Sequence, residues 1–285
     1  MKHVVVKFML WTALFNLSLS FSFSLSAKEL LTWRVIDWPP FYILSGKDKG
    51  QGIYDQLISK MIKALPEFEH RTMVMNTQRV LKELNKGAHV CHPSALENTQ
   101  ALLSKANSFL LPHRLIFDSR DTQKIAGDQT SISLINLLSD ESITVGIATE
   151  RYTSELNQIL SQFKGKAHLS HQNNYNGLVR MFFKKRVDAL IEYPPVITYA
   201  KQIFDAKMNN TSLAITELSK TNYLPVHFAC PNNDWGKNVI NKINQILIEE
   251  VKEDDYLAFR LKWYDKESQR LLSKYYLEDY LKDKH

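Results

Sequence analysis

The sequence predicts an α/β fold with two lobes. Short apolar runs typical of buried strands alternate with amphipathic helical patterns, first over residues 28–118 and again over residues 122–220. Another strand-like run starts at Tyr223, and no new strand–helix series follows it. We therefore expect residues 224–285 to return to the first lobe, so that two crossings of the chain form a hinge.

The first 27 residues have the pattern of a secretory signal peptide. Two lysines precede an uncharged, serine-rich apolar stretch at 8–23, and small residues follow up to a cleavage site near Ser26 or Ala27. An uncleaved membrane anchor is the alternative, because the apolar stretch is close to the roughly 18 residues that a membrane helix needs. The expected mature protein is exported to the periplasm and starts near residue 28.

Composition indicates a globular protein that does not bind nucleic acid. Apolar residues make up 44% of the chain and charged residues 23%, which excludes a disordered chain. Basic residues are scattered among acidic ones, so the net charge of +6 forms no basic stripe. Two cysteines, Cys91 and Cys230, follow the signal peptide, and in an oxidising compartment we expect them to form a disulfide. Two separate buried thiols are the alternative.

The first candidate site follows the first strand. Val35 and Ile36 end an apolar run, and the Pro39-Pro40 pair stops the strand because proline cannot donate to a sheet ladder. One carboxylate and three aromatic rings surround this stiff corner, and we expect them to contact a ligand; they are Asp37, Trp38, Phe41 and Tyr42. The alternative is that the rings are ordinary core residues.

The rest of the first lobe continues the alternation. Apolar positions from Tyr54 to Leu65 follow a helical stripe that Pro66 ends, 69–76 is a strand, and a helix follows from Thr77 to Gly87. The third strand, 89–95, runs into a loop and brings Ser94 to its end, where we expect it in the site. Two histidines and Cys91 lie within this strand, but a fourth ligand at any recognised spacing is missing, so we predict no metal site.

The second lobe contains a second candidate site. The strand 143–148 turns into a helix expected around Thr149, where backbone N–H groups with Arg151 and Tyr152 could bind an anionic group. The alternative for Arg151 is a solvated side chain. A strand at 187–191 then ends at Glu192 and Tyr193 before two prolines, which repeats the first corner. Ligands of open α/β sheets bind beyond the carboxyl ends of strands, so we expect Glu192 and Tyr193 in the site.

The last part of the chain is predicted to be a strand at 223–230, a long helix from Trp235 and a helical arm over 255–284 that packs on the outside.

Taken in order, these motifs resemble those of the family 3 extracellular solute-binding proteins. The matching segments cover nearly all of the mature chain: Asp37–Tyr42, Gly52–Asp55, Val145–Ile147, Arg186–Glu192 and Leu261–Trp263. The resemblance implies a periplasmic-binding-protein-like fold of type II with two hinge crossings, and an acidic, amine-binding position at Glu192. The arginine that clamps the ligand carboxylate in the family's amino-acid binders has no counterpart in 95–101.

The resemblance implies a periplasmic protein, expected to be a monomer, that closes around a small polar, cationic or amino-acid-like ligand and delivers it to a membrane permease. A soluble sensor that reports the ligand to a membrane signalling protein is the alternative. An enzyme is not expected, because the sequence has no nucleophile elbow, phosphate loop or metal signature, and we expect no cofactor.

Overall fold

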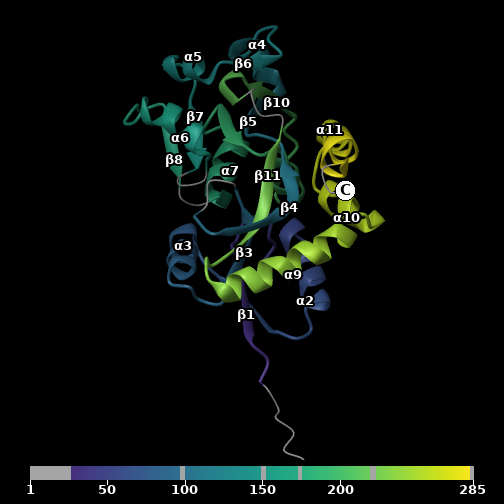
Figure 1. Ribbon diagram of the computed structural model, residues 1–285. Coiled ribbons are helices and arrows are strands. Elements are labelled where there is room, and N and C mark those ends of the chain that lie inside the picture. Colours follow the sequence, from purple (N-terminus) through teal and green to yellow (C-terminus); the bar gives the residue numbers. More distant parts are fainter. Residues whose placement is uncertain (1–26, 97–99, 149–151, 173–174, 219–222, 283–285) are drawn as a thin grey trace, which may run out of the picture.

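The computed structural model describes residues 27–96, 100–148, 152–172, 175–218 and 223–282. Within these ranges the chain forms two sheets with helices packed on them, which confirms the predicted α/β class. In Figure 1 the two sheets lie in separate lobes, the first below and the second above, and the C-terminal helices lie to one side of the junction.

The first lobe is built on a five-stranded sheet. In spatial order its strands are β2 (Glu69–Val74), β1 (Leu30–Val35), β3 (Val90–Ala95), β11 (Leu224–Cys230) and β4 (Leu102–Leu110). β1 is parallel to β2 and β3, whereas β11 is antiparallel to β3 and β4. The sheet therefore contains the returning strand, as the sequence predicts.

The helices of this lobe follow the predicted apolar stripes. They are α2 (Ile53–Ala64), α3 (Thr77–Asn85), α9 (Asp234–Glu250), α10 (Asp254–Leu261) and α11 (Lys266–Tyr275), after which a π-helical turn covers Tyr276–Tyr280. Helix α3 is capped by Asn76, whose side chain accepts from the Arg79 N–H, so Thr77 is its first residue and not its cap.

The second lobe is built on a six-stranded sheet. In spatial order its strands are β6 (Ser131–Ile132), β10 (Asn210–Ile215), β5 (Arg114–Asp118), β9 (Ala189–Glu192), β7 (Val145–Ala148) and β8 (Leu169–Gln172). Its helices are α4 (Thr122–Ile125), α5 (Leu134–Ser139), α6 (Ser154–Ser161), α7 (Tyr175–Phe183) and α8 (Pro194–Ile203), with 3₁₀ turns at Ser119–Asp121 and Thr216–Leu218.

The first crossing between the lobes comes earlier than the sequence suggests. The strand β5 pairs with β9 and β10 of the second sheet, so the chain crosses at 111–113 and not after residue 118. Its apolar run Leu115–Phe117 suits a central strand of either sheet, and its partners come much later in the chain. The second crossing runs from the end of β10 to β11; part of it, 219–222, lies outside the described residues.

Several elements were not predicted from the sequence, among them the strands β4 and β10 and the helix α8. The strand β4 lacks alternating hydrophobicity because Ser104, Asn107 and Ser108 are buried in it, where side-chain hydrogen bonds such as Asn107 Nδ2 to Pro93 O satisfy them. The strand β10 is mostly half-buried, and its first three residues are polar. The Pro194–Pro195 pair does not form a corner like the first one: it occupies the first turn of α8, where an N–H is not needed.

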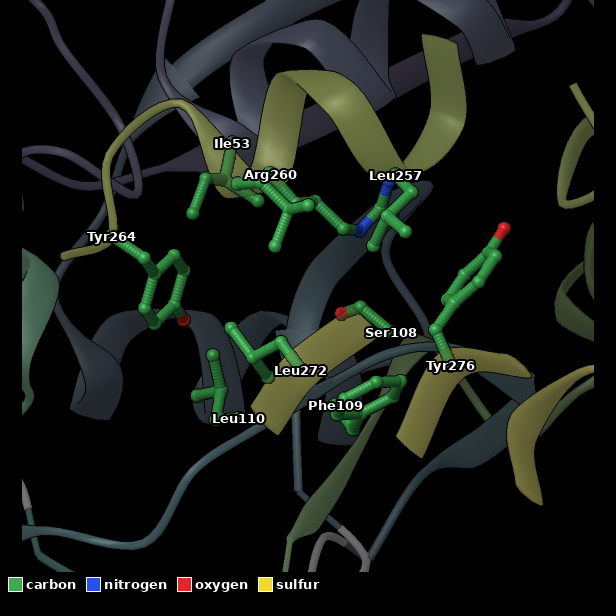
Figure 2. Close-up of a pocket in the computed structure, with 10 residues that line it drawn as sticks. Ile53, Ser108, Phe109, Leu110, Leu257, Arg260, Tyr264, Leu272 and Tyr276 are labelled. Carbon is green, nitrogen blue, oxygen red and sulfur yellow. The ribbon is translucent and has the colours of Figure 1, made fainter. Parts of the chain in front are cut away.

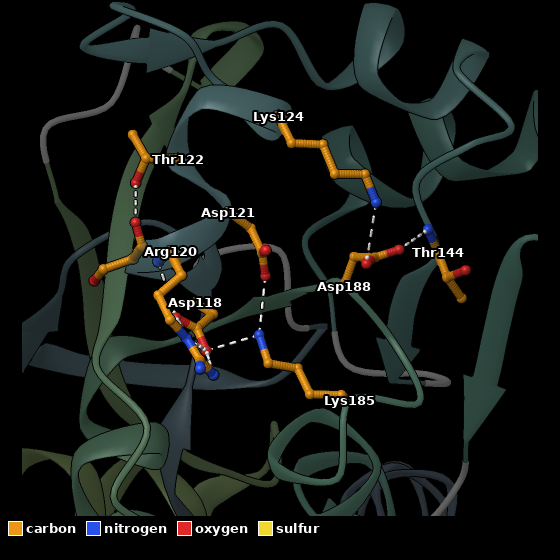
Figure 3. Close-up of polar contacts among 9 residues, drawn as sticks. Asp118, Arg120, Asp121, Thr122, Lys124, Thr144, Lys185 and Asp188 are labelled. Atoms are coloured by element: carbon orange, nitrogen blue, oxygen red, sulfur yellow. Dashed lines mark hydrogen bonds and ion pairs between the residues drawn. The ribbon is translucent and has the colours of Figure 1, made fainter.

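An ionic cluster lies around Asp118, at the end of β5 in the second sheet (Figure 3). The buried Asp118 carboxylate lies 2.9 Å from Arg120 Nη2 and 2.7 Å from Lys185 Nζ, and Lys185 also pairs with Asp121 at 2.9 Å. In the β5–β9 ladder Arg114 is opposite Glu192, so Asp118 lies at the other end of the strand from Glu192. We assign this cluster to stability and not to the site.

One continuous cluster of buried apolar side chains extends through both lobes and the junction between them. In the described ranges, no helix combines the length and the apolar character needed to cross a bilayer. The predicted signal peptide falls almost entirely on residues 1–26, which lie outside those ranges.

Candidate functional site

The loop after β1 is held in one shape by the start of α2. The Tyr42 N–H donates to Trp38 O at 2.9 Å and closes the turn around the two prolines. Asp55 Oδ2 accepts from the Ile43 N–H at 2.8 Å and from the Gly52 N–H at 3.0 Å, so one carboxylate ties the end of the loop to the first turn of the helix. Asp55 thus positions the aromatic loop, a role that its place in a helix start did not reveal.

Gly52 permits this close approach. A Cβ atom at this position would lie 2.8 Å from Phe41 O and 2.9 Å from Tyr42 Cα, both shorter than any relaxed contact. Only glycine lets the loop lie directly against the helix start, where the N–H groups of Ile53 and Tyr54 donate to Pro40 O and Phe41 O.

The residues predicted around the first corner take different places. Trp38 is half-buried and its ring centroid lies 4.1 Å from that of Phe41, whereas Asp37 is exposed. Tyr42 turns into the first lobe: its ring packs against Tyr54, and its hydroxyl lies 2.7 Å from Ser94 Oγ at the end of β3. The expected aromatic wall therefore consists of Trp38 and Phe41, with Tyr42 behind it.

The wall meets the second lobe at Tyr193. The ring centroid of Tyr193 lies 5.9 Å from that of Trp38 and 5.8 Å from that of Phe41, although about 150 residues separate them in the chain. On the other side, Tyr193 contacts the buried ring of His113, 3.8 Å away, in the first crossing. The structure thus brings the two predicted strand-end sites together beside the hinge; His113 was missed because a lone histidine in a loop has no pattern.

Glu192 lies at the base of this contact. Its side chain is only 1% exposed, and one carboxylate oxygen accepts from the Tyr193 N–H at 2.9 Å. The strand β9 thereby places a buried carboxylate directly before the ring that faces the first lobe.

The predicted anion site on the second lobe is built differently. Helix α6 begins at Ser154 with Thr153 as its cap, so the helix start lies beyond the expected Thr149. The Tyr152 hydroxyl accepts from the Ala148 N–H at 2.8 Å and donates to Ile191 O at 3.0 Å, which ties the ends of β7 and β9 together. Arg151 lies outside the described residues, so its role stays a prediction.

A buried cation lies on the first lobe instead. Arg34 is 4% exposed; its guanidinium donates to Met75 O at 3.0 Å and lies 3.4 Å from His92 Nδ1. None of its contacts within the described residues is a carboxylate. The sequence did not identify it as a site residue, although a charged side chain inside an apolar strand is a signal in itself.

Burial sets the charge states around this cation. It lowers the pKa of Arg34, an effect that the nearby Tyr42 opposes, and it raises the pKa of Tyr42 to about 12. Burial and the charge of Arg34 together hold the pKa of His92 well below its usual value. At neutral pH the cluster therefore carries one positive charge behind the Tyr42 and Ser94 hydroxyls, of which Ser94 is only half-buried.

Cys91 and Cys230 form a disulfide, as predicted. It joins the neighbouring strands β3 and β11 with a Cα–Cα distance of 4.5 Å. The histidines near Cys91 also have partners: His89 stacks on Trp235 with ring centroids 4.2 Å apart, and His92 faces Arg34. The described ranges contain no cluster of His, Cys, Asp and Glu that could hold a metal ion.

No protein-family model matches the sequence, and no curated protein does. Solved structures do. An ancestral arginine-binding protein bound to arginine superposes with a TM-score of 0.60 at 19% identity, covering 84% of this chain and 99% of that one. The fold is that of the two-lobed periplasmic binding proteins.

Two further matches have the same fold. A histidine kinase sensor domain with similarity to periplasmic binding proteins gives a TM-score of 0.61 at 13% identity, covering 83% of this chain and 96% of that one. A putative L-cystine ABC transporter protein from Listeria monocytogenes gives 0.60 at 15% identity, covering 84% and 97%. The predicted architecture is therefore confirmed, and identities this low concern the fold and not the ligand.

Proposed function

We propose that the protein is an exported solute-binding protein that closes its lobes around a small polar, amino-acid-like solute and presents it to a membrane importer. The observation that carries this proposal is the meeting of Trp38 and Phe41 with Tyr193 across the lobe junction. These residues follow strands β1 and β9, and ligands of open α/β sheets bind beyond such strand ends. Two lobes joined by two crossings can open and close around that position.

The charged groups on either side of the junction suit the two ends of a zwitterionic solute. Glu192 on the second lobe is a buried carboxylate, and a solute ammonium would stabilise its charge by a charge-assisted hydrogen bond. On the first lobe the half-buried Ser94 hydroxyl, polarised by Arg34 through Tyr42, suits a solute carboxylate. Trp38 and Phe41 would pack against the apolar part of the solute.

A thermal-shift screen would find the solute. It would contain the L-amino acids together with matched analogues that lack either the amine or the carboxylate. A solute that binds only the folded state adds about 2.7 kcal/mol at a hundredfold excess over Kd. The proposal predicts that at least one zwitterion stabilises the protein more than either of its analogues does.

Calorimetry on Glu192→Gln then tests the site. A hydrogen bond to a charged group contributes about 1.5–3 kcal/mol, so the variant should bind the solute roughly 10- to 150-fold more weakly. Glu155→Gln is the matched control, because it makes the same change in net charge on the exposed first turn of α6. Unchanged affinity in a folded Glu192→Gln protein would remove Glu192 from the site, and with it the reason for an amine on the solute.

The sensor alternative rests on one observation, the match to a histidine kinase sensor domain. We propose transport first, since the sequence resemblance is to solute-binding proteins. Crosslinking of the solute-loaded protein in native membranes would separate the two, by capture of either an importer subunit or a signalling kinase. We propose no catalytic activity and no cofactor.

Export also remains a proposal. If residues 1–27 are a signal peptide, the mature protein should be recovered from the periplasm as a monomer. Its intact mass should be that of a chain whose first residue is Ala27 or Lys28.

A further inference from the structure

A second contact joins the lobes outside the candidate solute site. Trp263, just after α10, is only 2% exposed, and its indole N–H donates to Gln51 O of the first lobe at 3.1 Å. Its ring lies edge-on to Tyr199 on α8 of the second lobe, with centroids 5.3 Å apart and planes at 75°. The same indole therefore contacts both lobes at once.

Helix α8 is the element of the second lobe that the first lobe holds. At its beginning Tyr193 meets Trp38 and Phe41, and two turns later Tyr199 meets Trp263. Burial raises the pKa of Tyr199, and the negative charges of Asp48 and Asp37 in the first lobe raise it further, so its phenol lies near the loop after β1.

Hydrogen bonds within the first lobe fix the position of Trp263. The helix before it is fixed to β4: Tyr256 Oη and Arg260 Nη2 both donate to Asn107 O, at 2.6 and 3.0 Å. Arg260 is itself 7% exposed and lies over the Tyr256 ring, with Cζ 3.8 Å from the centroid. Figure 2 shows Arg260 and Tyr264 beside a small hollow that Leu272 and Phe109 also line. Because its position is fixed in the first lobe, the Trp263 ring can restrain Tyr199 and with it α8.

We propose that Trp263 is a positioning residue for the cleft: through Tyr199 it clamps α8 to the first lobe and so favours the closed arrangement of Tyr193 and Glu192. Its effect on solute affinity rests on the proposed function, whereas its effect on lobe closure does not. Edge-to-face aromatic pairs contribute enough to shift a two-state ratio roughly 2- to 12-fold. Loss of the clamp should lower the closed-to-open ratio by that factor.

Lobe separation can be measured without any solute. Spin labels on Lys82→Cys in α3 and Gln158→Cys in α6 occupy exposed positions, one on each lobe, and Figure 1 shows these helices on the same side of the molecule. Pulsed dipolar spectroscopy of Trp263→Leu should show a larger long-distance population than the parent. Tyr199→Leu should do the same, and the double variant should have little further effect, because both substitutions remove the same contact between Trp263 and Tyr199.

The matched control is Trp235→Leu, which removes an indole stacked on His89 within the first lobe and should leave the distances unchanged. Equal distance distributions for Trp263→Leu and the parent, in proteins with cooperative thermal unfolding, would overturn the clamp. With a solute from the screen, Trp263→Leu should bind 2- to 12-fold more weakly. If the lobes open as expected but no solute binds the parent, the proposed function fails and the clamp stands.

Discussion

Removal of the Cys91–Cys230 disulfide should destabilise the first lobe by up to about 5 kcal/mol. The bond closes a loop with a sequence separation of 139 residues, and in the chain-entropy model a loop of this length restricts the unfolded chain by about that amount at 25 °C. The loop contains the whole second lobe: the chain leaves the first lobe after β4 and returns as β11, next to β3. Without the bond, the pairing of β3 with β11 alone must offset the conformational entropy that the chain loses when this loop closes.

The double variant Cys91→Ala/Cys230→Ala is the cleanest perturbation, because both sulfurs are fully buried and alanine adds no unpaired polar group. Guanidinium denaturation would be followed by two signals. The sequence has no tryptophan between residues 39 and 234, so tryptophan fluorescence reports the first lobe, whereas far-UV circular dichroism reports both.

The fluorescence transition should move to lower denaturant and separate from the dichroism transition, because the dichroism signal also includes the second lobe, whose sheet the disulfide does not join. Reduced wild-type protein should behave like the double variant, which would show that the lost bond and not the missing sulfur atoms causes the shift. A free energy of unfolding within about 1 kcal/mol of the oxidised parent, in both proteins, would refute the entropic reasoning.

Two further changes test individual contacts. Arg120, followed by Lys185, holds the pKa of Asp118 well below its ordinary value. The ionised Asp118 carboxylate therefore stabilises the fold above the unfolded pKa near 4, and this stability is lost as the pH falls below that value. Asp118→Asn should be less stable than wild type at pH 7, and urea melts should show the difference in unfolding free energy between the two proteins narrowing by up to about 1.4 kcal/mol per pH unit below pH 4. A constant difference would contradict this. Gly52→Ala forces a Cβ against backbone atoms of Phe41 and Tyr42 and should cost about 1–3 kcal/mol in thermal or chemical melts. Because Gly52 has a φ of −66°, which alanine adopts without strain, the loss would come from this steric contact alone, and unchanged melts would contradict it.

The fold was predictable wherever hydrophobic periodicity and burial agree. The apolar stripe of α2 and the apolar run 189–191 in β9 predict these two elements directly, because each segment carries its own pattern. The strand β4 could not be found in this way, since its buried serines and asparagine are satisfied by partners distant in the chain. Helix α8 was hidden by its two prolines, which end a strand and begin a helix equally well.

The candidate site was predictable at strand ends but not across the junction. Trp38 and Tyr193 were each found from a carboxylate–aromatic–proline pattern, and the rule that ligands lie beyond strand ends placed both on the same side of their sheets. Their mutual contact depends on how the two crossings orient the lobes, and no local pattern encodes that. The contact of Trp263 with Tyr199 could not be predicted from a local pattern either, because each ring alone has the pattern of an ordinary core residue.

The charged groups show why the arrangement across the lobe junction matters for the function. The sequence placed both the candidate anion-binding group, Arg151, and the candidate amine-binding group, Glu192, on the second lobe, and only the aromatic wall on the first. The structure adds a buried cation, Arg34, behind Ser94 on the first lobe. On the proposed function, a zwitterion would then have to bridge Ser94 and Glu192 to satisfy both of its ends, and only the closed arrangement allows that. A solute with one charged end would gain from one lobe alone and would close the protein less, so selectivity for zwitterions would follow from closure itself.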